Sequence, residues 1–341
     1  MKRKRNLLYI GNKLAAKGST LSTIESLSRK LQEEGFTVTS ASAVVSKPLR
    51  MIHMLYSVWK YRKWADLVLI DTYSTLNFQY AVWVATVCRW FTIAYIPILH
   101  GGNLPTRLQK SKKQSRKLFG NATTNVAPSN YLLEVFKEEG YSNLTYIPNT
   151  IEIEKYPFSL REHPKPKLLW VRSFAELYNP MLALRILEHL IQDGYMEAEL
   201  CMIGPDKDGS MAQCKAYAIQ KNLPVRFTGG LIREEWLQQS KGYDIFINTT
   251  HVDNTPVSVI EAMALGLPVI STNVGGIPYL LTQDDTGILV PPNSIENFVA
   301  AIKQILQNPD KTTAMTIKAR NSVEKFDWKE VKKHWISTLQ K

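Results

Sequence analysis

Short apolar, β-rich runs alternate with helical stretches along most of the chain, and this alternation limits the fold more than any other feature. In the first half the runs are NLLYIGN, TVTSASAV, LVLIDTY and TIAYIPIL, separated by helical patterns at about 20–34, 49–63 and 76–90. Strands that are apolar almost throughout are typical of a parallel sheet covered by helices on both faces. The first half is therefore predicted to be a doubly wound α/β domain.

A second alternating series begins after NTIEIEKYPFSLREHPKPK (149–167), which is rich in proline and charge. Its apolar runs are LLWVRSF, AELCMIG, VRFTGG, YDIFINTT, PVISTN and TGILVPP. Such a linker between two similar series marks a domain boundary. We predict an N-terminal domain over 1–150, a C-terminal domain over 151–325, and a final helix over 326–341 that packs on its own domain or back on the first. Apolar residues at helical spacing predict one buried face for that helix: Phe326, Trp328, Val331, Trp335 and Leu339.

Positive charge is concentrated in the first half of the chain. Residues 1–150 carry 21 Lys/Arg against 8 Asp/Glu, whereas residues 151–341 carry 21 against 22. A basic half is typical of a surface that faces a polyanion such as nucleic acid, an anionic membrane leaflet or phosphorylated substrates. A solvated basic face explains any single cluster equally well, including KYRK at 60–63 and RLQKSKKQSRK at 107–117.

The cysteines and the apolar runs bear on the cellular compartment. Cys88, Cys201 and Cys214 have no CxxC spacing, so neither a disulfide framework nor a zinc site is indicated. The run LLYI after the basic start is too short for a signal-peptide core, and Arg89 and Pro97 interrupt the longest candidate membrane span. We expect a cytoplasmic protein without a transmembrane helix, for which the inner face of the membrane is a candidate partner through the basic stretches.

The stretch DNTPVSVIEAMALGLPVISTNVGG (253–276) points to a ligand. Thr255 is predicted to cap a helix that has Pro256 at its first position and ends near Gly266. Free backbone N–H groups at the start of such a helix favour an anion such as phosphate, and here they belong to Val257, Ser258 and Val259.

A carboxylate on this apolar helix, that of Glu261, requires a partner. Burial of an unpaired charge is costly, whereas sugar hydroxyls would donate hydrogen bonds to it. An ion pair with a structural arginine is the alternative explanation.

The same stretch resembles the motif of family-4 retaining glycosyltransferases (glycosyl transferases group 1), in which seven residues separate two glutamates. Asp253 takes the first acidic position and Glu261 the second, and AMALGLPVISTNVGGIPYL follows. Weaker similarity extends to IPNTIE, IGP, FTGGL and GILVPP. The resemblance implies the GT-B fold, in which two Rossmann-like domains enclose a cleft, and transfer of a sugar from a nucleotide-diphosphate sugar.

The resemblance also implies roles for individual residues. Glu261 would hold the ribose hydroxyls, and Asp253, where the family usually has Glu, would contact the donor sugar. Arg172 in WVRSFAELYNP takes the first diphosphate-binding position, but the lysine that usually follows is absent, and Asn179 with helix N-terminal amides is expected to replace it. Base recognition falls to the loops at 203–206 and 228–231. The remaining donor-binding candidates are Gly11, Gly204, Thr228, Gly229, Thr255, Val257, Ser258 and Val259.

The N-terminal domain adds a candidate histidine and two glycine loops. His100 in ILHGGNLP follows a strand and precedes two glycines, and the resemblance implies that it lines the cleft near the transferred sugar. His100, Asp253 and Arg172 are therefore the catalytic candidates. Acceptor-binding candidates come from the loop YIGNKLAAKGST and from the segment after His100: Lys17, Gly18, Gly101, Gly102 and Asn103.

No metal site is predicted. DKD at 206–208 superficially matches a metal-binding DxD motif, but we interpret it as a solvent-exposed loop. GT-B enzymes generally need no bound metal, and no cofactor is expected beyond the nucleotide sugar as co-substrate, with a UDP-sugar favoured.

We therefore predict a retaining, metal-independent glycosyltransferase that acts on a lipid-linked or cell-envelope glycan, as in capsule, exopolysaccharide or lipopolysaccharide synthesis. Two alternatives stay open. One is a GT-B epimerase that acts on a nucleotide sugar without an acceptor. The other is a non-catalytic polyanion-binding protein, although basic motifs interleaved with aromatics, typical of nucleic-acid binding, are not evident.

Overall fold

A computed structural model describes residues 4–13 and 22–340, and within it the chain divides into two compact units. Unit 1 comprises Met1–Pro148 together with Lys332–Lys341, and unit 2 comprises Asn149–Val331. Each unit has its own parallel sheet and its own core, so the predicted α/β class is confirmed. The cleft between the domains stays a prediction.

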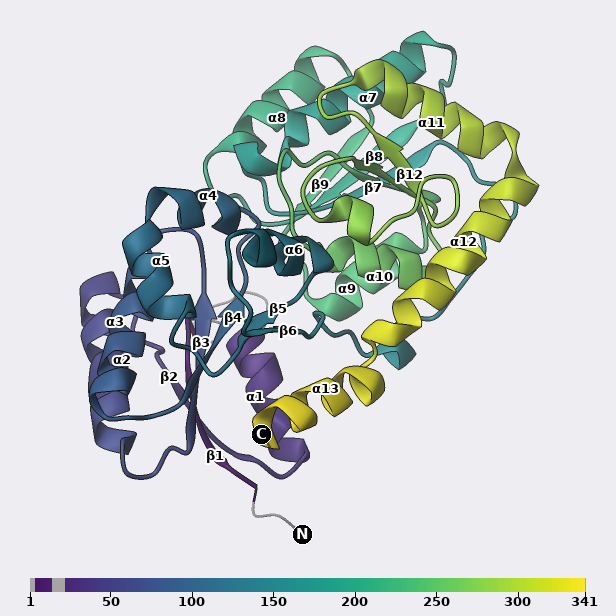
Figure 1. The fold of residues 1–341 in the computed structure, drawn as a ribbon. Coiled ribbons are helices and arrows are strands. Elements are labelled where there is room, and N and C mark those ends of the chain that lie inside the picture. Colours follow the sequence, from purple (N-terminus) through teal and green to yellow (C-terminus); the bar gives the residue numbers. More distant parts are fainter. Residues whose placement is uncertain (1–3, 14–21, 341) are drawn as a thin grey trace. The chain divides into compact units, whose positions relative to one another are not determined.

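Unit 1 is built on a six-stranded parallel sheet of order β2-β1-β3-β4-β5-β6 (Figure 1). Its strands are β1 (Asn6–Ile10), β2 (Thr37–Ala41), β3 (Leu67–Thr72), β4 (Tyr95–Leu99), β5 (Asn125–Ala127) and β6 (Leu144–Tyr146). Every residue of β3 and β4 is buried, as expected for central strands with helices on both faces.

Two strands of this sheet were not predicted. β5 and β6 have three residues each, and β5 begins with an asparagine whose side-chain nitrogen donates to the Phe119 carbonyl at 3.0 Å. Runs this short, one of them opened by a polar residue, give no apolar pattern to detect.

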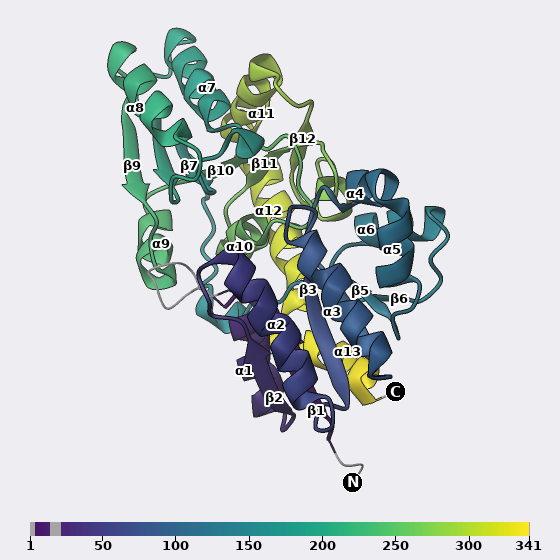
Figure 2. The same cartoon turned by 90° about the vertical axis from the view of Figure 1, so that its left-hand side faces the viewer.

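The helices of unit 1 connect successive strands. They are α1 (Thr23–Glu33), α2 (Lys47–Tyr61), α3 (Phe78–Trp90), α4 (Leu104–Lys110), α5 (Lys112–Phe119) and α6 (Asn130–Glu138). α2, α3 and α5 lie side by side (Figure 2), and their inner faces form one core with alternate residues of the strands, including Leu8, Met54 and Phe119.

Unit 2 repeats the architecture with the sheet order β12-β11-β10-β7-β8-β9. Its strands are β7 (Lys167–Val171), β8 (Glu199–Ile203), β9 (Val225–Gly229), β10 (Ile245–Asn248), β11 (Val269–Thr272) and β12 (Ile288–Val290). All six coincide with predicted apolar runs. β7 and β10 are neighbours at the centre, so the loops that follow them meet at one edge of the sheet.

The helices of unit 2 cover both faces of this sheet, with separate buried clusters on each side. The α-helices are α7 (Pro180–Gln192), α8 (Ser210–Gln220), α9 (Arg233–Ser240), α10 (Val257–Leu265), α11 (Ile295–Gln307) and α12 (Pro309–Val323). Short 3-10 turns are η2 (Ile153–Lys155), η3 (Glu176–Tyr178), η4 (Ile277–Tyr279) and η5 (Glu324–Phe326).

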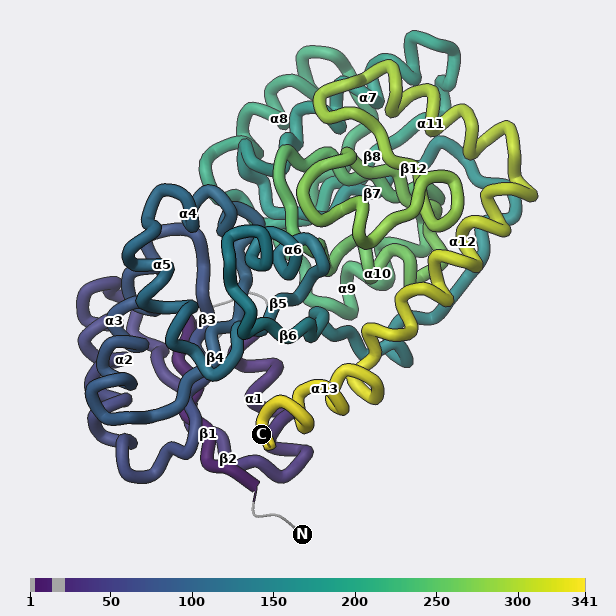
Figure 3. Tube along the Cα trace, viewed as in Figure 1, coloured from purple at the N-terminus to yellow at the C-terminus, as the bar shows by residue number. Residues whose placement is uncertain are grey.

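The last helix, α13 (Trp328–Gln340), begins in unit 2 and belongs to unit 1 from Lys332 onward. Val331, Trp335 and Leu339 are buried, so the predicted apolar face is confirmed. Lys332 Nζ donates to Glu34 Oε1 at 2.9 Å, just after α1. Figure 3 traces the end of α13 beside α1. In the described part of the chain, no helix is both long and apolar enough to cross a bilayer.

Candidate donor and sugar site

The strongest candidate site in unit 2 lies where β7 and β10 end. Arg172 directly follows β7, and Asp253 stands in the loop between β10 and α10. Thr249, just beyond β10, accepts a hydrogen bond from Trp170 Nε1 at 3.0 Å and donates to the Tyr178 carbonyl at 2.9 Å. These bonds hold the end of β7, the end of β10 and the η3 turn together.

Arg172 and Asp253 form a buried ion pair between guanidinium Nη2 and carboxylate Oδ2. The Arg172 guanidinium also stacks over the Tyr178 ring, 4.6 Å from its centroid, and its Nε has no hydrogen-bond partner among the described residues. Burial lowers the pKa of Arg172 to about 10, so the group stays cationic at neutral pH. The ion pair is neutral overall, but the guanidinium keeps a donor without a partner among the described residues, which suits an anionic ligand that takes the place of Asp253.

Two glycines determine where Asp253 sits. The Gly276 N–H donates to the Asp253 carbonyl at 2.9 Å, and a Cβ added to Gly275 or Gly276 would overlap the carbonyl oxygen of Asp253 or Asn254. Gly275 also has φ +54, in the left-handed region. The Gly-Gly turn beyond α10 thus allows the close backbone contact that presents Asp253 to Arg172.

The loops at 203–206 and 228–231, which are predicted to recognise the base, also show a close backbone contact. Gly204 donates its N–H to the Gly229 carbonyl at 2.8 Å, and a Cβ at Gly204 would overlap the Arg172 carbonyl oxygen. Thr228 donates to the Gly229 carbonyl at 2.9 Å. Packing against Arg172 explains Gly204, whereas Gly229 has open space around it and a φ of +73, which favours glycine. A role of either residue in base binding stays a prediction.

Asn179, the predicted substitute for the missing lysine, is in the left-handed conformation at the start of α7, with φ +47. Its Nδ2 donates to Asn293 Oδ1 at 2.9 Å. The amide therefore already has a partner, and a diphosphate would have to compete with it.

α10 begins one residue later than predicted. Pro256 is extended and is itself the N-cap, so the prediction that Thr255 caps the helix is wrong. The Val259 N–H is also not free, because it donates to the Pro256 carbonyl at 3.1 Å. No backbone acceptor for the amides of Val257 and Ser258 is found among the described residues, and these two amides remain candidates to bind an anion.

Glu261 lies on α10 with a phenol, and not an arginine, as its hydrogen-bond partner. Tyr156, from the linker, donates its OH to Glu261 Oε1. Burial raises the pKa of Glu261 to about 7, while the Tyr156 hydrogen bond and the nearby Arg233 charge act in the opposite direction. Burial likewise raises the pKa of Tyr156, so the phenol remains the donor. Glu261 is thus poised between its neutral and ionised forms near neutral pH.

In unit 1, His100 follows β4 and belongs to a buried polar cluster. Its Nε2 lies 2.7 Å from Asp71 Oδ1, and the same oxygen accepts a hydrogen bond from the Tyr9 hydroxyl at 2.7 Å. The His100 ring stacks on Tyr73 with ring centroids 5.3 Å apart. Asp71 is only 1% exposed and its Oδ2 has no partner in the described part of unit 1. The carboxylate therefore orients the imidazole, with Nε2 as the donor, and leaves Nδ1 for another contact.

The glycine-loop candidates have packing roles as well. A Cβ on Gly11 would overlap Asp71 Oδ2, and a Cβ on Gly101 would stand 2.9 Å from the Ser74 nitrogen. Asn103 is the exposed N-cap of α4, and Gly102 precedes it. Lys17 and Gly18 lie outside the described residues.

The DKD segment is exposed, as predicted. Asp206 Oδ1 accepts the Gly209 N–H at 2.9 Å and Asp208 Oδ1 accepts the Ser210 N–H at 3.1 Å, so both carboxylates stabilise the start of α8. Among residues 4–13 and 22–340 no three His, Cys, Asp or Glu side chains are grouped to hold a metal ion.

Two residues of these clusters were missed from the sequence. Asp71 closes the otherwise apolar strand LVLIDT, and an acid at the carboxyl end of a buried parallel strand is a signal that could have identified it. Tyr156 stands in the linker, where nothing in the pattern distinguishes it.

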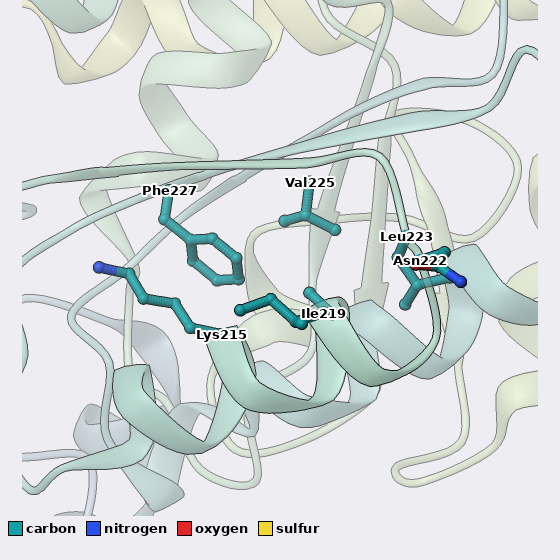
Figure 4. Close-up of a pocket in the computed structure, with 7 residues that line it drawn as sticks. Lys215, Ile219, Asn222, Leu223, Val225 and Phe227 are labelled. Carbon is teal, nitrogen blue, oxygen red and sulfur yellow. The ribbon is translucent and has the colours of Figure 1, made fainter.

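A separate hollow of about 490 Å³ lies between α8 and the edge strand β9 (Figure 4). Its lining is mostly apolar, and Lys215 Nζ stands 6.0 Å from the Phe227 ring centroid. None of the predicted donor-binding residues lines it.

The chain matches a known family and several curated proteins. The family model described as glycosyl transferases group 1 matches residues 152–322, half of the chain, a range that includes Arg172, Asp253 and Glu261. The sulfoquinovosyl transferase SQD2 of Arabidopsis thaliana is 30% identical over 142 residues, 41% of this chain and 27% of that protein. The amylovoran biosynthesis glycosyltransferase AmsK of Erwinia amylovora is 24% identical over 286 residues, 76% of this chain and 66% of that protein. Each match spans less than two thirds of the relative's length.

Solved structures resemble the whole chain in fold. Anabaena Alr3699/HepE in complex with UDP has a TM-score of 0.75 at 15% identity, covering 98% of this chain and 99% of that one. Sucrose-phosphate synthase from Thermosynechococcus elongatus has a TM-score of 0.82 at 15% identity, covering 99% and 98%.

Proposed function

Because this chain belongs to the glycosyl transferases group 1 family, we propose that it transfers a sugar from a UDP-sugar to a lipid-linked or cell-envelope glycan, with retention of the anomeric configuration. The chain has the GT-B fold. That it acts as a glycosyltransferase on a nucleotide sugar is part of the proposal, as are the base, the sugar, the acceptor and the stereochemistry.

The observation that carries the proposal is the cluster at the carboxyl ends of β7 and β10. Arg172 offers a buried cation with an unused donor, and Val257 and Ser258 offer two helix N-terminal amides. Together they would neutralise the charge that grows on the diphosphate as the glycosidic bond breaks. No metal ion is needed in this scheme, because the chain itself supplies the positive charge.

Glu261 would bind the ribose. Once ionised, its carboxylate is an acceptor only, and Tyr156 already occupies Oε1. The remaining acceptor sites can take the ribose hydroxyls as donors. Donor binding would thus draw Glu261 into its ionised form.

Asp253 and His100 would act on the transferred sugar. Asp253 is paired with Arg172 in this structure, and a bound diphosphate would take over that role and leave the carboxylate for a sugar hydroxyl. We propose front-face attack, in which the donor phosphate helps remove the acceptor proton, so no covalent nucleophile is required. His100, oriented by Asp71, would steady the sugar as its anomeric carbon becomes cationic.

The acceptor proposal has two supports. AmsK, which is 24% identical over 76% of this chain, is named for amylovoran biosynthesis. The basic unit 1 suits an acceptor that carries phosphate or lies at an anionic surface. Lys17, Gly18, Gly101, Gly102 and Asn103 remain its predicted contacts.

A donor screen tests the proposal first. Thermal shifts with UDP-, GDP-, ADP- and CMP-sugars should single out UDP, since a ligand at about 100 times its dissociation constant stabilises by roughly 2.7 kcal/mol. The shift should disappear in Glu261→Ala and persist in Glu197→Ala, a matched control that removes an exposed carboxylate of unit 2.

Transfer is then assayed with a polyprenyl-diphosphate glycan, and the product anomer is read by NMR. Turnover of the donor without any acceptor would identify an epimerase instead. If no nucleotide sugar shifts the melting temperature and the protein binds polyanions in a salt-sensitive way, its function is to bind polyanions and not to transfer a sugar.

A further inference from the structure

Helix α2 carries apolar side chains on its solvent side as well as on its core side. Leu49, Ile52, Tyr56 and Trp59 recur at helical spacing and are 49–61% exposed. The core side of the same helix is buried through Met54 and Val58. A helix of a globular protein normally turns polar residues to water, so this second apolar stripe needs a partner.

The stripe continues onto the neighbouring helix α3. The Arg62 guanidinium lies 4.8 Å from the Trp59 ring centroid and 5.6 Å from that of Phe91, and so joins the ends of the two helices. Beside Phe91, Trp90 is 73% exposed. We call this surface the α2–α3 face, formed by Leu49, Ile52, Tyr56, Trp59, Trp90 and Phe91; the two helices lie side by side in Figure 2.

Charge in the part of the chain that forms this face is predominantly positive. Residues 35–133 contain twelve Lys/Arg and two acids, Asp66 and Asp71. Asp71 is buried, and Asp66 accepts a hydrogen bond from the Asn6 backbone N–H. Exposed lysines flank the α2–α3 face at Lys47, Lys60 and Lys63, and five further Lys/Arg stand on the adjacent α5 and its entry.

From this arrangement we infer that the α2–α3 face docks on an anionic lipid bilayer. Trp and Tyr partition to the interface between headgroups and acyl chains, and lysines reach past them to lipid phosphates. A second copy of the chain would bring like charges together, which disfavours self-association through the same face. The surface thus combines the two signals, apolar insertion and positive charge, that stable peripheral binding requires.

This inference rests on the proposed function only for its biological purpose, since a lipid-linked acceptor would be met at such a surface. The binding itself is independent of the donor, the sugar and the stereochemistry.

The test is flotation of the full chain with vesicles of phosphatidylcholine containing 30–40% phosphatidylglycerol, roughly the range of anionic membranes, against pure phosphatidylcholine. We expect binding to the anionic vesicles only, weakened by salt. Ile52→Ser combined with Trp59→Ser should reduce it at least tenfold. Ile219→Ser, which removes a 77% exposed apolar side chain from unit 2, is the matched control and should bind as the parent does.

A charge variant tests the second signal without touching the apolar stripe. Lys60→Gln with Lys63→Gln should weaken binding by roughly fivefold for each lysine removed and flatten the salt dependence. Thermal unfolding and helical circular dichroism, measured on every variant, check that both units remain folded.

Unchanged vesicle binding in the folded Ile52/Trp59 variant would overturn the inference. The inference would also be overturned if the parent chain does not bind vesicles but forms a concentration-dependent dimer that the Ile52/Trp59 variant abolishes. Vesicle binding without any response to nucleotide sugars would leave this inference standing and refute the proposed function instead.

Discussion

Affinity for a UDP-sugar should fall as the pH drops through 7, because one buried carboxyl must lose its proton to bind the ribose. Burial raises the pKa of Glu261 to about 7. Ribose hydroxyls donate to an ionised carboxylate, so binding favours the charged form and releases a proton below pH 7. Stabilisation of the complex by this group is therefore complete above pH 7 and is lost as the pH falls.

The size of the effect follows from the pKa. Each pH unit below about 7 should reduce the affinity by about tenfold, or about 1.4 kcal/mol, until the pKa of the complex is reached. Between pH 8 and pH 6 we expect about a tenfold weakening. Arg172, whose pKa is about 10, stays charged throughout this range and adds no slope of its own.

Isothermal titration with UDP-glucose at pH 6, 7 and 8 measures the effect. UDP-glucose is preferable to UDP because both of its phosphates are esterified, whereas a terminal phosphate titrates near a pKa of about 6. Glu261→Gln should bind more weakly at pH 8 but with the same affinity at all three pH values. Tyr156→Phe removes a hydrogen bond that lowers the pKa of Glu261, so its loss of affinity should begin at a higher pH.

An equal pH dependence in the parent and in Glu261→Gln would refute the reasoning. It would mean that another group titrates, or that Glu261 does not contact the donor.

Three further substitutions test the rest of the site. Asp71→Asn should lower kcat about 10- to 100-fold with little change in the donor KM and should shift the pH profile of kcat, because His100 loses the carboxylate that orients it. If the ratio of the parent kcat to the variant kcat is the same at every pH, Asp71 has only a structural role. Asp253→Asn should lower transfer about 100-fold or more while UDP binds at least as tightly, because Arg172 loses its competing partner; weaker UDP binding in titrations would contradict this. Gly204→Ala should lower the melting temperature well beyond Gly209→Ala, a control with positive φ but open space around it, since the added Cβ overlaps the Arg172 carbonyl; equal shifts would show that the loop adapts.

Most strands of the two sheets could be predicted because they are apolar nearly throughout, and such apolar runs can be recognised in the sequence. All six strands of unit 2 coincide with predicted runs. β5 and β6 were not found, because three-residue strands are stabilised by their neighbours in the sheet and not by a pattern of their own. The start of α10 was misplaced by one residue because Pro256 can stand either at the cap or at the first helical position.

The sequence identifies candidate residues for the site but not their pairings. The resemblance implies roles for Arg172 and Asp253, yet their ion pair joins residues far apart in sequence and depends on β7 and β10 being neighbours. Glu261 was expected to need a partner, and that partner, Tyr156, comes from a linker that tertiary packing alone brings to α10.

The division of α13 has a practical consequence for anyone who wishes to study one half of the protein. The stretch from Lys332 belongs to unit 1 and buries Trp335 and Leu339. A fragment that stops at Pro148 would therefore leave the apolar surface beneath this helix in water, and we expect it to aggregate. A permuted gene that joins the last helix to the first strand through a short linker would place this helix back on the apolar surface of unit 1 within a single polypeptide.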